Sequence, residues 1–163
     1  MYLDNIQIMG FKSSIDSVAD TLDKINSIKR DGEIIQLLNA DSIVSKNHII
    51  HGVNQAFLAF ERGENLANDI SVEIVLRISA QRQISKAFKM LGLKEGDMNL
   101  CAVMINSNDY GDELSSMFTL DETVLVPNNE KLIEIYKISE GELSNMSVED
   151  IIIDRITKLT VDY

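Results

Sequence analysis

The sequence contains an unbroken run of six apolar residues, Leu100–Ile105. A short apolar run of this length is typical of a strand buried on both faces, so we predict a central strand here. Three other segments have weaker strand patterns. They are residues 1–12, where apolar and polar residues alternate loosely, residues 33–38, and residues 123–126, an edge strand closed by Pro127. Together they predict a sheet of about four strands.

Longer segments carry apolar residues at the three- and four-residue spacing of amphipathic helices. The clearest one follows Ser45, a favourable N-cap, and stops before Gly63, a residue type common at helix C-termini. Helices are expected at about residues 15–31, 46–62, 81–91, 112–117, 129–138 and 148–159. We therefore predict an α+β fold forming a single domain over residues 1–163. A small, mostly antiparallel sheet of about four strands should pack with about six helices.

The segment Ile70–Ile78 fits both kinds of secondary structure. Apolar residues at every second position from 70 to 78 match a strand, whereas those at 70, 74, 75 and 78 match a helix. The regular alternation slightly favours a strand.

Composition narrows the class of protein. The chain has 15 Lys and Arg against 26 Asp and Glu, a formal net charge of −11, and it contains one cysteine, Cys101. A single cysteine excludes an internal disulfide, and no apolar run reaches the length of a membrane span. The start, Met1–Asp4, lacks the basic and apolar regions of a secretory signal. We expect a cytoplasmic protein without a membrane partner.

Motifs for catalysis or cofactor binding are absent from the sequence. There is no phosphate-binding glycine loop with its lysine, no nucleophile elbow and no set of paired metal ligands. His48 and His51 lie three residues apart on one helix, but two histidines without a third ligand make a poor metal site. Asp109, Asp112 and Glu113 lack the spacing of a calcium loop. We expect no catalytic residue, no metal and no cofactor; an enzyme that uses the two histidines is a weaker alternative.

A basic window interrupts this acidic chain. No Asp or Glu occurs between Glu73 and Glu95, whereas the window holds five cations, Arg77, Arg82, Lys86, Lys89 and Lys94. On a helix starting at Gln81, Arg82, Lys86 and Lys89 share one face. A net charge of −11 repels nucleic acid at long range, so any anion site here must act locally. A merely solvated helix face is the alternative interpretation.

The same window carries a family motif. The stretch from Glu73 to Phe88 reads EIVLRISAQRQISKAF and is followed by Leu91-Gly92. It resembles the kinase-binding subunit of the KEOPS complex, the PRPK-binding protein family, whose pattern centres on Ser-x-x-Arg-Gln-Ile. Upstream, Asn39-Ala40-Asp41 and the helix opened by His48-Ile49 fit as well. Ala80 stands where the family often has glycine, at a position suited to a left-handed turn. The resemblance covers about residues 33–106.

The resemblance implies a non-catalytic subunit of the complex that makes threonylcarbamoyladenosine at position 37 of tRNA. Family members bind and stimulate the complex's small atypical kinase/ATPase, help to capture tRNA through its 3′ CCA end, and meet the other KEOPS subunits indirectly. A pure protein scaffold that binds the kinase without touching RNA is the alternative.

Candidate binding residues follow from the window and the resemblance. For RNA they are Lys46, His48, Arg77, Gln81, Arg82, Gln83 and Lys86. Arg77 in an ion pair and His48 packed within its own helix are the structural alternatives. For the kinase they are Ile151, Ile152 and Ile153, three consecutive apolar residues in one helix that cannot all face one core. Burial of the whole helix in its own domain is the alternative there.

Overall fold

The structure, a computed structural model, describes residues 2–161. These residues fall into two units. The sheet unit comprises residues 3–40 and 92–125, and the helical unit comprises residues 2, 41–91 and 126–161. Each unit is therefore built from segments far apart in the sequence. The prediction of one domain over residues 1–163 stays a prediction.

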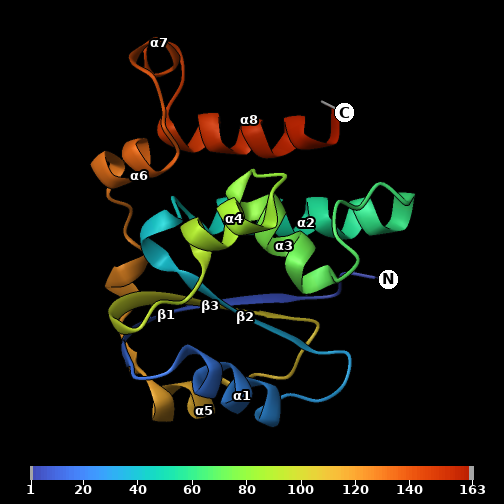
Figure 1. The fold of residues 1–163 in the computed structure, drawn as a ribbon, viewed down its shortest axis with the longest axis vertical. Helices are drawn as coiled ribbons and strands as arrows, with labels where there is room; N and C mark the ends of the chain where they lie inside the picture. The colour runs from blue at the N-terminus through green and yellow to red at the C-terminus, as the bar shows by residue number, and fades with distance from the viewer. Residues whose placement is uncertain (1, 162–163) are drawn as a thin grey trace. The chain divides into compact units, whose positions relative to one another are not determined.

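The sheet unit is organised around four antiparallel strands in the order β2-β3-β1-β4 (Figure 1). They are β1 Ile6–Ile15, β2 Ile34–Asn39, β3 Gly96–Ile105 and β4 Thr119–Leu120. The predicted central strand is confirmed, because β3 lies between β1 and β2 and all residues from Leu100 to Ile105 are buried. The predicted α+β class and the small antiparallel sheet are confirmed as well.

Helices α1 Val18–Ile28 and α5 Gly111–Met117 lie on one side of this sheet (Figure 1). Ile25 and Leu114 enter a core formed with strand residues such as Phe11 and Leu100. Helix α1 begins later than predicted because β1 runs on to Ile15. The N-cap is Ser17, whose hydroxyl accepts a hydrogen bond of 3.2 Å from the backbone N–H of Asp20.

The prediction of an edge strand at residues 123–126 is wrong. The segment forms a 3-10 helix, η2 Glu122–Leu125, and the strand that pairs with β1 is the two-residue β4 before it. Gly10 explains this turn, since a Cβ built there would lie 2.7 Å from Val124 Cγ2 and 2.9 Å from the Asp121 carbonyl oxygen. Without a side chain at Gly10, η2 folds directly against β1.

The helical unit contains the short η1 Ala40–Ser42 at its border and six α-helices. These are α2 Lys46–Arg62, α3 Ile70–Ser79, α4 Ile84–Leu91, α6 Asn129–Ile135, α7 Glu140–Leu143 and α8 Val148–Val161. Helix α8 packs against α2 and α3. Residues 2–161 thus hold eight α-helices, and the two beyond the predicted six are α3 and α7. Within the same residues, no helix has both the length and the apolar character needed to span a bilayer.

The slight preference for a strand at residues 70–78 is wrong, because this segment is helix α3. The Asp69 carboxylate accepts hydrogen bonds from the N–H groups of Ser71 and Val72 and so caps the helix. Residues Glu73 to Ser79 are all buried. A helix buried on every side lacks a polar face, and its apolar residues can then fall into an alternating pattern.

We expect Gly52→Ala to destabilise the protein. Helix α2 passes so close to α3 that a Cβ at Gly52 would lie 2.6 Å from Ile78 Cγ1 and 3.0 Å from Ile78 Cα. Since one of these atoms belongs to the backbone, the helices must separate, at an expected cost of about 1–3 kcal/mol in the free energy of unfolding. Urea denaturation measures this loss. Asn54→Ala, on an exposed site of the same helix, is the control and should change stability by less than about 0.5 kcal/mol.

Candidate functional site

The predicted RNA-binding residues Gln81, Arg82 and Gln83 form the turn between α3 and α4. Helix α3 ends at Ala80 in the left-handed conformation, with φ 55° and ψ 40°, and the N–H of Gln81 donates to the Leu76 carbonyl at 3.0 Å. The left-handed turn is thus present although the residue is alanine, not glycine. It places Arg82 and Gln83 on the surface and leaves Gln81 half-buried.

Helix α4 extends this turn with a mixed basic and apolar surface. Ala87 and Leu91 are buried, and Lys86 is exposed. The helical spacing of Ile84, Ala87, Phe88 and Leu91 predicts that all four point inward. For Ile84 and Phe88 this prediction is wrong, since their exposed fractions are 52% and 40%. Local spacing identified an apolar stripe, but the helix buries only the part of it that Ala87 and Leu91 occupy. We use "basic corner" for Gln81, Arg82, Gln83 and Lys86.

A hollow adjoins the basic corner. It has a volume of about 210 Å³ and is lined by Ala80, Arg82, Arg155, Lys158 and Leu159. Arg82 Nη2 donates a 3.1 Å hydrogen bond to the Leu159 carbonyl, which fixes the guanidinium beside α8. Three cations therefore converge here from the α3–α4 turn and from helix α8, which are more than 70 residues apart in the sequence.

The two cations from α8 were not among the predicted site residues. Arg155 pairs with Glu142 at 3.0 Å, and Lys158 pairs with Asp154 at 2.9 Å, four residues earlier on the helix. These carboxylates partly neutralise the hollow. Nothing in the local sequence of α8, which contains both signs of charge, indicated that Arg155 and Lys158 face the basic corner.

Of the two candidates on α2, Lys46 is exposed and His48 is fully buried. The ring nitrogen Nδ1 of His48 accepts a hydrogen bond from the Val44 N–H at 3.2 Å, so Nε2 carries the proton and donates to the Ile78 carbonyl at 2.8 Å. The ring also lies edge-on to Tyr136. His48 therefore ties the start of α2 to the end of α3, in agreement with the structural alternative.

Burial lowers the pKa of His48 from 6.5 to about 4. Between these two pH values the unfolded chain binds a proton that the folded protein does not, so the free energy of unfolding should fall as the pH falls. The full effect is about 3 kcal/mol. We expect His48→Gln to remove this part of the pH dependence, measured as the difference in stability between about pH 7 and about pH 4.5.

His51→Gln is the control for that measurement. His51 is partly buried, its pKa is also lowered by burial, and its Nε2 lies 2.8 Å from Thr157 Oγ1. His51 should account for a smaller part of the pH dependence of the free energy of unfolding. If His48→Gln left the pH dependence of the free energy of unfolding unchanged, His48 would not be a buried neutral imidazole. Among residues 2–161, no three potential ligands are grouped to hold a metal ion with these histidines.

Arg77 is fully buried and lies in an ion pair. Its Nε donates to Glu73 Oε2 at 2.8 Å, and its Nη1 donates to Thr160 Oγ1 at 3.0 Å. Glu73 Oε1 in turn accepts from the N–H groups of Leu66 and Ala67. The side chain has no surface to offer RNA in this structure, and its contacts match the structural alternative.

The candidate kinase-binding residues lie on α8. Ile151 and Ile152 are buried in a core that also contains Val44, Leu132 and Tyr136, and Ile153 is half-buried. The first two therefore hold α8 to its own unit. The exposed apolar residues of the helical unit lie elsewhere, and Ile84 and Phe88 are two of them.

Comparison with known proteins identifies the family. The model of the family "Kinase binding protein CGI-121" matches residues 13–158, which is most of the chain. The chain belongs to the CGI-121 family. It is also similar to the regulatory protein Cgi121 of Methanocaldococcus jannaschii, with 33% identity over 117 residues that cover 69% of this chain and 77% of that protein.

Membership of the CGI-121 family confirms the resemblance carried by the Ser79–Ile84 motif. The family is kinase-binding and regulatory, and this agrees with a non-catalytic role. Of the predicted RNA-binding residues, the structure brings Gln81, Arg82, Gln83 and Lys86 together on the surface, while His48 and Arg77 serve inside the helical unit.

Proposed function

We propose that this CGI-121 family protein is a non-catalytic KEOPS subunit that acts in the cytoplasm. In this role it binds and stimulates the complex's small kinase/ATPase and helps to recruit tRNA through its 3′ CCA end for threonylcarbamoylation at position 37. The description of the CGI-121 family as kinase-binding supports the kinase partner. Contact with the other KEOPS subunits is indirect. The observation that carries the RNA contact is the exposed basic corner beside the hollow lined by Arg82, Arg155 and Lys158.

A small cationic surface suits a single-stranded end. Arg and Lys side chains bind phosphates, while amide side chains can hydrogen-bond to unstacked bases. Gln81 and Gln83 flank Arg82 and supply such amides. Phe88, 40% exposed on the next helix, offers an aromatic face for stacking. A net charge of −11 opposes contact along the tRNA duplex, so the interaction should be confined to its end.

Salt dependence tests the size of this contact. If about three cations neutralise phosphates of a single strand, the logarithm of the binding constant should fall with that of the salt concentration with a slope of about −2. Fluorescence anisotropy of labelled tRNA at several salt concentrations gives the slope. A slope near zero would contradict phosphate binding at the basic corner, and a slope steeper than about −6 would indicate contact along the duplex.

The alternative, a protein scaffold without RNA contact, is favoured by one observation. Ile84 and Phe88 lie one helical turn apart and are both exposed, as expected of an apolar surface that meets another protein. Size-exclusion chromatography of the protein with the kinase, with and without tRNA, separates the two hypotheses. If the protein recruits tRNA, the protein, the kinase and tRNA should elute as one species. If it is a scaffold without RNA contact, the two proteins should elute together and tRNA separately.

A further inference from the structure

One edge of the sheet is left open along part of β1. Strand β1 spans ten residues and pairs with β3 over its whole length, but β4 pairs only with Phe11 and Lys12 on the opposite side. The Asp121 N–H donates to the Gly10 carbonyl at 2.9 Å just beyond this pairing. The segment Ile6–Met9 therefore lies past the end of β4.

The backbone groups that face this open edge can be assigned. In an antiparallel strand, the N–H and C=O of alternate residues point to opposite edges. Gly10 directs its carbonyl to the β4 side, whereas Asn5 directs its carbonyl to Asn106, next to β3. Ile6 and Ile8, in step with Gly10, must then direct their N–H and C=O outward. In the described part of the chain, these groups have no hydrogen-bond partner.

Proteins usually protect such an edge with a charge, a proline or a bulge. Residues Ile6–Met9 carry no charge and no proline, and their pairing with β3 is regular, without a bulge. An unprotected edge with unpaired donors and acceptors is a template for an added strand.

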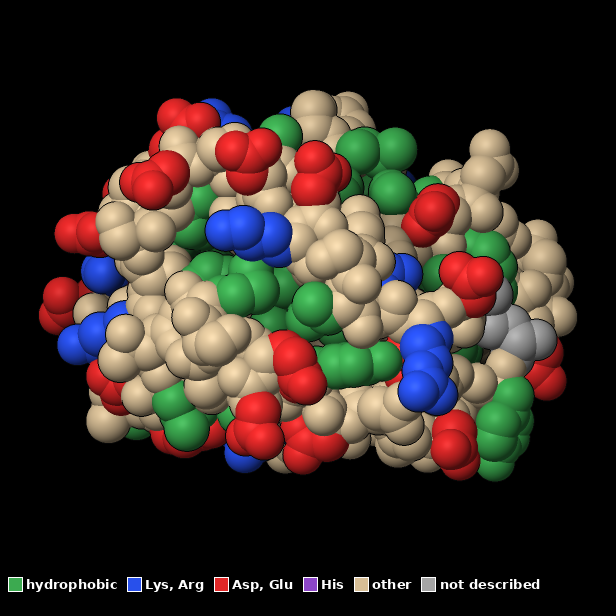
Figure 2. Space-filling model, turned by 90° about the horizontal axis from the view of Figure 1, so that it is seen from below, with side chains coloured by type: hydrophobic (Ala, Val, Ile, Leu, Met, Phe, Trp, Pro, Cys, Tyr) green, Lys and Arg blue, Asp and Glu red, His purple; other side chains and the backbone are tan. Residues whose placement is uncertain are grey.

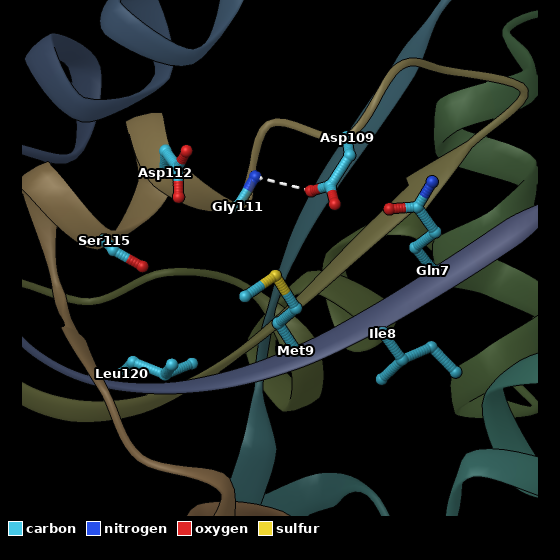
Figure 3. A pocket seen from close by; sticks show the side chains of 8 residues that line it. All are labelled: Gln7, Ile8, Met9, Asp109, Gly111, Asp112, Ser115 and Leu120. Carbon is cyan, nitrogen blue, oxygen red and sulfur yellow. Dashed lines mark hydrogen bonds between the residues drawn. The ribbon is translucent and has the colours of Figure 1, made fainter.

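A hollow of about 460 Å³ lies beside the same segment, within the sheet unit. Figure 3 shows Met9 and Leu120 along its strand side, with Asp109, Asp112 and Ser115 around it. None of the described residues that line it is basic. Asp109 Oδ1 accepts from the Gly111 N–H at 2.8 Å. Apolar side chains below carboxylates form a site that suits a long cationic side chain, which has an apolar stem and a charged tip.

The acidic character extends beyond this hollow. The sheet unit, residues 3–40 and 92–125, holds 13 Asp and Glu against 5 Lys and Arg. Figure 2 shows Asp and Glu side chains spread over the face seen from below, with hydrophobic side chains and some Lys and Arg among them. This net negative charge disfavours nucleic acid and favours a basic protein segment. A second copy of this chain fits poorly, because its own Ile6–Met9 would bring no cation to Asp109 and Asp112.

We propose that the open edge of β1 at Ile6–Met9 binds an extended segment of a partner protein as an added strand, with a Lys or Arg of that segment in the hollow between Asp109 and Asp112. The outward N–H and C=O groups of Ile6 and Ile8 provide the affinity through backbone hydrogen bonds, and the acidic hollow selects the side chain. This site is independent of the basic corner and of RNA.

A synthetic strand tests the proposal on the full-length protein. The probe is an acetylated and amidated hexapeptide, Thr-Val-Lys-Val-Thr-Val, added at up to about 1 mM, the range expected for a short peptide. Binding should protect the amides of Ile6 and Ile8 from hydrogen exchange and shift their NMR signals. The same peptide with Glu in place of Lys, or with its outward amides methylated, should bind at least about tenfold more weakly.

Two variants locate the site. Asp112→Lys should weaken the lysine peptide about tenfold, because it places a like charge in the hollow. Glu113→Lys, on the same helix but outside the hollow, makes the same change in charge and should have little effect. Ile8→Pro removes one outward N–H and leaves pairing with β3 intact, so it should also weaken binding.

Three results would overturn the proposal. One is the absence of any change at the Ile6 and Ile8 amides at the highest peptide concentration. Another is equal weakening by Asp112→Lys and Glu113→Lys, which would show a general charge effect. The third is a concentration-dependent dimer in sedimentation velocity that Ile8→Pro abolishes, because a second copy would then occupy the edge.

Discussion

Replacing Arg77 by methionine should lower the free energy of unfolding by about 3–5 kcal/mol, the range for breaking a buried ion pair. The substitution leaves the Glu73 carboxylate buried without the guanidinium 2.8 Å away. It also removes the hydrogen bond from Arg77 to Thr160, which links α3 to α8. Urea denaturation monitored by circular dichroism measures the loss.

Arg62→Met is the matched control, since it removes the same group from an exposed position and should change stability by less than about 0.5 kcal/mol. The affinity for tRNA provides a second readout. A structural Arg77 predicts that folded Arg77→Met retains its RNA affinity. Loss of RNA binding with unchanged stability would instead place Arg77 in the RNA contact and contradict the buried ion pair.

The double substitution Arg82→Glu with Lys86→Glu should weaken tRNA binding about 100-fold or more at low salt. It removes two cations from the basic corner and adds two carboxylates that repel phosphates. Stability should fall by only about 1 kcal/mol, the scale of a partly buried hydrogen bond such as that from Arg82 to the Leu159 carbonyl. Anisotropy titration with labelled tRNA gives the affinity, and urea denaturation shows that the variant is folded.

A second double variant, with the same net charge as Arg82→Glu/Lys86→Glu, controls for the effect of the protein's overall charge. Arg62→Glu with Lys24→Glu reverses two exposed cations, one in each unit, outside the basic corner. It should weaken binding much less, since distant surface charges are screened by salt. Equal losses in the two double variants would show that the net charge, not the corner, controls tRNA affinity.

The fold could be predicted where local patterns coincide with tertiary packing. Leu100–Ile105 is buried on both faces and reads as a central strand, and α2 begins after Ser45 and ends at Gly63 as its capping residues indicate. The prediction failed at α3, where burial on all sides adds apolar residues that alternate as they would in a strand. It also failed at residues 123–126, where the space above Gly10 lets the chain turn back onto β1.

The candidate site, too, could be predicted only in part from local sequence. The basic corner could be predicted because the family motif and the charge pattern coincide within residues 73–88. The burial of Arg77 could have been suspected from Glu73 four residues earlier, a spacing that favours an ion pair. Arg155 and Lys158 could not be found, because they reach the hollow only through the packing of α8 against α3.

One comparison tests whether the protein holds the 3′ end of tRNA. The dissociation constant is measured for the same tRNA with its CCA end intact and with those nucleotides removed, at one salt concentration. Stacking contributes about 1–3 kcal/mol per base, so removing three nucleotides should weaken binding at least about 100-fold. Equal affinity for the two RNAs would show that the protein does not bind tRNA through its CCA end.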